Sequence, residues 1–155
     1  MTGNNIARLI DTAIQREKEA YLFYMDLRNR VQDPAARETI EWIANEEIKH
    51  REFLERYRAG GFDPSALEMR NVVFYKIAEY QEEPEITETM NPQDAFLVAS
   101  HRELKSHRFY GELAALHQDG ETREMLLKIA NEELKHKEKM EYLYTNAAFP
   151  QTSGG

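Results

Sequence analysis

Apolar residues recur at alternating spacings of three and four along four long stretches of the chain, the pattern of amphipathic helices with one buried face. Asp33-Pro34 and Asn91-Pro92 each combine a capping side chain with a proline suited to the first helical turn. Gly60-Gly61 and Asp119-Gly120 mark breaks. We therefore predict helices that start after Asn4 or Asn5, Asp33, Asn91 and Gly120, and that end near Gln32, Ala59, Gln118 and Asn146.

The lengths of the connections predict how these helices are arranged. Short links join the first helix to the second and the third to the fourth, so each pair should form an antiparallel hairpin. Residues 62–90 form a long middle segment, which contains an apolar stretch, Ala66 to Tyr80, that we expect to be helical. The predicted fold is all-α: a four-helix bundle over residues 1–146 with a long crossover between helices 2 and 3, followed by a flexible tail over residues 147–155.

One octapeptide occurs twice, with a single difference between the copies. IANEEIKH ends at His50, and IANEELKH ends 86 residues later at His136. On every predicted core face an apolar stripe is interrupted near its middle by a Glu, and in the second and fourth helices a His follows three residues later. The interrupting residues are Glu17, Glu47, His50, Glu103, Glu133 and His136. The 86-residue offset superposes the two halves, so all six are expected at one level of the core.

Four facing carboxylates repel one another and need a compensating charge that two imidazoles do not supply. Two divalent cations would neutralise them, and carboxylate with one His per metal suits iron or manganese, with zinc also possible. A single Glu-x-x-His is common in helices and weak by itself, and a lone Glu can reach solvent at the rim of a bundle. The matched set of four helices favours the metal interpretation.

Several further residues lie near this level. Tyr24 and Tyr110 follow Glu17 and Glu103 by two helical turns, so they either pack as aromatics or donate hydrogen bonds to the site. Glu46 and Glu132 lie about 100° around their helices from the adjacent Glu, and we expect them to be solvated or to support the ligands indirectly. We expect the remaining histidines to be at the surface: His101, His107 and His117.

Composition restricts the classes of function. The formal net charge is −8 and no basic cluster occurs, which disfavours nucleic acid as a partner. No stretch approaches the roughly 18 apolar residues of a membrane span, and the first residues lack a signal-peptide pattern, so a cytoplasmic protein is expected. The absence of cysteine excludes disulfides and thiolate metal sites within this sequence.

With these motifs the chain resembles the ferritin-like di-iron carboxylate proteins, closest to the rubrerythrin di-iron domain. The matching residues are Glu17, Tyr24, Glu47-x-x-His50, Glu103, Tyr110 and Glu133-x-x-His136, within a resemblance that spans roughly Ile6 to Tyr144. Rubrerythrin carries in addition a rubredoxin-like domain with four iron-binding cysteines, of which this sequence has none. It also carries an extra carboxylate where this chain has Ser100, so a more symmetric site is expected here.

The resemblance implies a non-haem di-iron oxidoreductase that reduces hydrogen peroxide or dioxygen, with His50 and His136 as terminal ligands. An external electron donor such as a rubredoxin-like protein is implied as the partner. Two alternatives stay open: a ferroxidase that oxidises Fe(II) and releases Fe(III), and a non-catalytic helical module stabilised by a metal such as zinc. We also predict a homodimer, because the crossover carries an apolar surface (Val72, Val73, Phe74 and Ile77).

Overall fold

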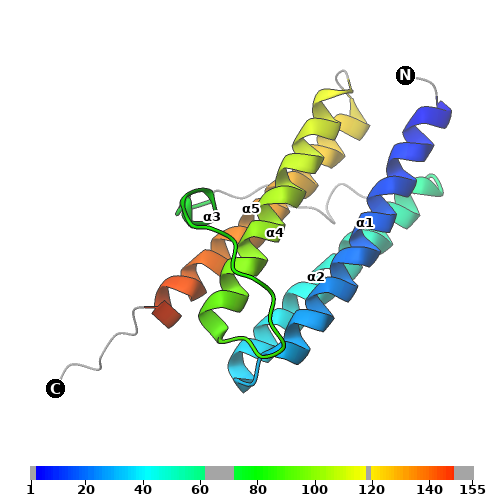
Figure 1. Cartoon of the computed structure of the whole chain (residues 1–155). Coiled ribbons are helices and arrows are strands. Elements are labelled where there is room, and N and C mark those ends of the chain that lie inside the picture. The colour runs from blue at the N-terminus through cyan, green and yellow to red at the C-terminus, as the bar shows by residue number, and fades with distance from the viewer. Residues whose placement is uncertain (1–2, 62–71, 118–119, 149–155) are drawn as a thin grey trace.

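The computed structural model describes residues 3–61, 72–117 and 120–148. Within these residues the chain forms helices and no strand, which confirms the predicted all-α class. The helices are α1 (Gly3–Arg30), α2 (Pro34–Arg58), α3 (Ile77–Tyr80), α4 (Pro92–Ala115) and α5 (Glu121–Ala148). α1 packs along α2 and α4 packs along α5, as two hairpins that lie side by side (Figure 1).

The helix ends follow from their capping residues. The Asp33 carboxylate accepts a hydrogen bond from the Ala36 amide at 2.9 Å, and the Asn91 side chain accepts one from the Asp94 amide at 2.8 Å. Each cap precedes a proline at the start of its helix. α2 ends where Gly60 adopts a φ of +100°, a left-handed conformation that favours glycine. These caps fix the register of α2 and α4 along the bundle.

The apolar core consists of two clusters that join the hairpins. One surrounds Leu27, Ile40 and Met140 near the α1–α2 turn, and the other surrounds Ile10, Leu54 and Ile129 near the opposite end. Tyr24 belongs to the first cluster and Tyr110 to the second, and each tyrosine reaches a glutamate of the opposite hairpin. The polar level of the bundle lies between the two clusters.

The crossover differs from its prediction. Only Ile77–Tyr80 is helical, and residues 72–76 are not, so the expected helix is wrong over that part; residues 66–71 lie outside the described residues. Lys76, directly before α3, adopts a left-handed φ of 56° that interrupts a helix, and α5 binds the segment on both sides: Glu138 accepts from the Val73 amide at 3.0 Å, and Glu141 accepts from the Ala78 amide, in the first turn of α3, at 2.7 Å. These amides are anchored to another helix.

A buried ion cluster fixes the crossover on α5. Lys137 is 2% exposed, and its ammonium lies 2.6 Å from Glu141 Oε1 and 2.8 Å from Glu79 Oε1. The second Glu141 oxygen accepts the Ala78 amide. The lysine charge is therefore compensated by two carboxylates. Because Lys137 follows His136 directly, the cluster also fixes the turn of α5 that carries this histidine.

The ends of the helices depart slightly from the predicted limits. α1 stops at Arg30 instead of Gln32, since the Arg30 carbonyl accepts the Met90 amide at 2.7 Å where the crossover returns. α4 stops at Ala115, and its predicted end at Gln118 lies outside the described residues. α5 continues to Ala148, past the predicted end, and the remainder of the expected tail also lies outside the described part.

The crossover presents apolar side chains at the surface. Val73 and Phe74 are 56% and 64% exposed, whereas Val72 and Ile77 are half-buried. The homodimer that we predict through this surface stays a prediction. Among the helices in the described ranges, none is long and apolar enough to cross a membrane.

The Lys137 cluster generates a prediction about stability. Glu141→Ala removes the carboxylate that binds both the buried ammonium and the Ala78 amide, so we expect a loss of about 3 kcal/mol in unfolding free energy. Urea denaturation followed by circular dichroism measures this loss. Glu52→Ala, an exposed α2 position, is the control and should change stability by no more than about 0.5 kcal/mol. Equal effects of the two substitutions would show that the cluster contributes little.

Candidate metal centre

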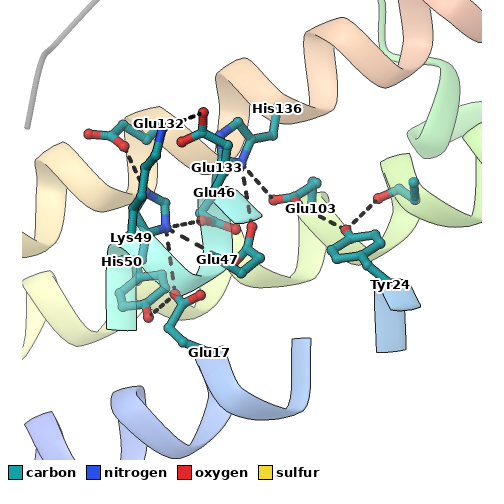
Figure 2. Close-up of polar contacts among 12 residues, drawn as sticks. Glu17, Tyr24, Glu46, Glu47, Lys49, His50, Glu103, Glu132, Glu133 and His136 are labelled. Atoms are coloured by element: carbon teal, nitrogen blue, oxygen red, sulfur yellow. Dashed lines mark hydrogen bonds and ion pairs between the residues drawn. The ribbon is translucent and has the colours of Figure 1, made fainter. Parts of the chain in front are cut away.

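Six predicted residues converge between the two apolar clusters. They form two groups, in each of which one ligand atom per residue lies within 4.8 Å of the others. The first group is Glu17, Glu47, His50 and Glu133, and the second is Glu47, Glu103, Glu133 and His136. Glu47 and Glu133 belong to both groups, so the arrangement has two shared carboxylates and, on each side, one further carboxylate and one imidazole (Figure 2).

Helix geometry explains the convergence. Glu47 and His50 are three residues apart on α2, and Glu133 and His136 are three apart on α5, so each pair projects from one face of its helix. α1 and α4 add one Glu each from the opposite side of the core. All six residues are at most 6% exposed. The site is therefore a polar layer inside an apolar bundle.

Many atoms of this layer lack hydrogen-bond partners. The atoms without one among the described residues are Glu17 Oε2, Glu47 Oε1, His50 Nδ1, Glu103 Oε2, both Glu133 side-chain oxygens and His136 Nδ1. His50 Nδ1 and Glu133 Oε1 are 2.8 Å apart yet do not form a hydrogen bond. Buried polar atoms left unpaired are costly. Oxygen and imidazole nitrogen donors directed at one small region fit divalent metal ions such as iron, manganese or zinc.

Without metal, the carboxylates must share protons. Burial, followed by repulsion from neighbouring carboxylates, holds the pKa of Glu47 and that of Glu133 well above 4.5. Burial acts against ionisation of Glu103 too, but Glu133, His136 and Tyr24 lower the pKa of Glu103 to about 2. The two shared glutamates thus carry protons that a metal would displace.

The pKa values of Glu17 and His50 are also set by burial and by neighbouring charges. Burial opposes ionisation of Glu17, yet the neighbouring Glu47, His50 and Tyr110 lower the pKa of Glu17. Burial also opposes protonation of His50, but the carboxylates of Glu132, Glu133 and Glu17 raise the pKa of His50 well above 6.5. In the metal-free layer the pKa values of Glu17 and Glu103 are thus lowered, whereas those of the two shared glutamates and of His50 are raised.

Both tyrosines contact the layer through their hydroxyl groups. Tyr24 donates to Glu103 Oε1 at 2.9 Å, and Tyr110 donates to Glu17 Oε1 at 2.5 Å, each across the α1–α4 interface. The two tyrosines therefore both pack as aromatic rings and donate hydrogen bonds. Phe23 and Phe109 pack edge to face against the two rings at 5.4 and 5.2 Å between centroids, which restrains their orientation.

The other polar candidates separate into distinct environments. Glu132 Oε1 lies 2.7 Å from His50 Nε2, whereas Glu46 pairs with Lys49 at 3.5 Å. The expected surface position of the three remaining histidines is wrong for His117, which is 8% exposed because its ring folds back onto the Leu113 carbonyl at 2.9 Å. His107 is half-buried through a 2.7 Å contact with the Ala130 carbonyl, and His101 binds the Gln81 carbonyl at 2.9 Å.

One neighbour of the site was not anticipated. Trp42 on α2 packs edge to face against His136, with ring centroids 5.5 Å apart and an interplanar angle of 78°. It lies one position before Ile43, off the predicted core stripe, and its equivalent in the second half is Lys128. The second half has no tryptophan at the equivalent position. Comparing the two halves therefore shows that Trp42 differs between them, but not that it contacts the site.

These pKa shifts predict a pH-dependent effect of metal removal on stability. The pKa values of Glu47 and Glu133 are raised in the folded protein, so these groups stabilise the metal-free fold fully below pH 4.5 and lose that stabilisation as the pH rises through their folded-state pKa values. The raised pKa of His50 acts in the same direction, and its stabilisation is lost above pH 6.5. We therefore expect a chelator to lower the melting temperature more at pH 8 than at pH 5. Calorimetry with and without chelator measures this difference, and an effect that is flat with pH would contradict it.

Comparison with known proteins agrees with the geometry. No curated protein and no solved structure matches this chain. The sequence model of the rubrerythrin family, in contrast, matches residues 8–144, which include all six convergent residues and both tyrosines. With a match over most of its length and a buried carboxylate–histidine layer that can hold metal ions, the chain belongs to the rubrerythrin family.

Proposed function

We propose that this protein is a non-haem di-iron oxidoreductase that reduces hydrogen peroxide, or dioxygen, with electrons from an external carrier. The observation that supports the proposal most is the set of four buried glutamates and two histidines whose unpaired atoms are directed at one region. Membership of the rubrerythrin family supports the choice of iron over manganese or zinc.

In this proposal Glu47 and Glu133 would hold both metal ions, since both belong to each group of possible ligands. Glu17 with His50, and Glu103 with His136, complete the two positions. Tyr24 and Tyr110 orient the unshared carboxylates by donating to one oxygen of each, which directs the other oxygen toward the metal. The two apolar clusters limit the access of water from both ends of the bundle.

A pair of Fe(II) ions held by these residues would supply two electrons, enough with two protons to reduce one hydrogen peroxide to two waters. Two electrons from a one-electron carrier of the rubredoxin type would then restore the reduced protein. These 155 residues contain no cysteine, so an iron–thiolate carrier must come from outside them. A cytoplasmic location, where such carriers operate, belongs to the same proposal.

The assignment of ligands generates the first test. Glu47→Ala removes a shared carboxylate, whereas Glu46→Ala, its neighbour on the same helix, removes a group paired with Lys49. After anaerobic loading with Fe(II), we expect about two irons per chain in the original protein and in Glu46→Ala, and less than about one in Glu47→Ala. Iron analysis after gel filtration gives the stoichiometry. Equal loss in both variants would mean that the wrong helix face was assigned.

The reaction is tested by titration. The anaerobic, Fe(II)-loaded protein should consume about one peroxide per two irons and then stop, because two irons supply two electrons. Addition of a reduced one-electron carrier should restart consumption, with two carrier electrons used per peroxide. Peroxide consumption that continues without reductant would indicate disproportionation and refute the proposal. Loss of the oxidised iron from the protein would indicate a ferroxidase instead.

A further inference from the structure

The two halves of the metal centre are surrounded differently, although their sequences are nearly identical. The 86-residue offset relates His50 to His136, Glu46 to Glu132 and Trp42 to Lys128. If the halves were equivalent, Glu132 would approach His50 just as Glu46 approaches His136. The structure shows only the first of these contacts within the described residues.

A carboxylate contacts His50 on the ring nitrogen that faces away from the other ligands. Its Nε2 lies 2.7 Å from Glu132 Oε1, while its Nδ1 faces Glu133 and Glu17 at 2.8 and 3.8 Å (Figure 2). A proton on Nε2 that is donated to Glu132 leaves the Nδ1 lone pair free for a metal. Such a partner fixes the ring and makes the imidazole a stronger ligand.

His136 has an aromatic neighbour in place of the carboxylate. Its Nδ1 faces Glu47 and Glu103 at 3.5 and 3.8 Å, but within the described part of the chain no carboxylate lies at ion-pair distance from its Nε2. Glu46, the counterpart of Glu132, pairs with Lys49. The ring instead packs at a steep angle against Trp42, and the Lys139 ammonium lies 3.7 Å from the centroid of the Trp42 ring.

The remaining groups do not compensate for this difference. Glu47 and Glu133 are shared by both positions. Glu17 and Glu103 each accept one tyrosine hydrogen bond. The two positions therefore differ chiefly in what supports their histidines, and a carboxylate favours a bound cation where an aromatic ring and an ammonium do not.

We propose that the two metal positions are inequivalent: Glu132 is the positioning residue of His50, and the ion held by Glu17, Glu47, His50 and Glu133 binds first and more tightly than the ion on the His136 side. This inference rests on the proposed metal centre. Loss of a supporting carboxylate weakens metal binding about 10- to 100-fold in comparable sites. The difference between the two binding steps should be of that order.

Anaerobic calorimetric titration of the metal-free protein with Co(II) tests the proposal. The original protein should show two steps, and Glu132→Gln, which keeps the shape but removes the charge, should weaken the tighter step about 10- to 100-fold with little effect on the other. Glu46→Gln is the matched control and should leave both steps unchanged. Two equal steps in the original protein, or an unchanged tighter step in Glu132→Gln, would overturn the proposal.

Two further variants assign the steps to positions. His136→Ala should retain the tighter step, and His50→Ala should lose it; the reverse result would also overturn the proposal. With one equivalent of Co(II), proton NMR should show a strongly shifted, exchangeable imidazole N–H from His50 that is absent in His50→Ala. Failure of the original protein to bind any Co(II) would refute the metal centre itself, whereas equal binding steps would refute only the inequivalence.

Discussion

The burial of four carboxylates at one level of a helical core is the constraint on which this structure depends. Burial and repulsion between like charges raise the pKa of Glu47 and that of Glu133, whereas neighbouring groups lower those of Glu17 and Glu103. Two divalent cations would offset that repulsion. The apolar clusters on either side hold the layer in place, which makes the bundle a scaffold for charges that the folded chain alone accommodates poorly.

Sequence reasoning found the fold and the convergent residues because both depend on short-range periodicity. The spacing of Glu47 and His50, and its repetition at Glu133 and His136, fixes side chains on one helix face regardless of distant contacts. The short links and Asx-Pro caps fix which helices form hairpins. Each of these signals lies within a few residues in the chain, and tertiary packing leaves them unchanged.

The errors arose where distant contacts override local pattern. The apolar stretch before Tyr80 has the composition of a helix, but Glu138 and Glu141, more than sixty positions later, bind its amides. His117 lies off the core stripe and is nevertheless buried, because α4 ends there and the ring covers its own helix end. No periodicity encodes which carboxylate of the distant α5 will meet a given amide. Those contacts follow only from the path of the crossover.

The same reasoning explains how a repeated octapeptide acquires two different environments. Glu46 and Glu132 are equivalent residues with different partners: Glu132 contacts a histidine of another helix, whereas Glu46 pairs with a lysine of its own helix. Residues outside the repeat differ at these places: Trp42 packs against His136, whereas its counterpart Lys128 lies 3.3 Å from Glu124. An internal repeat therefore supplies equal ligands, while the residues that differ around it give each histidine different neighbours.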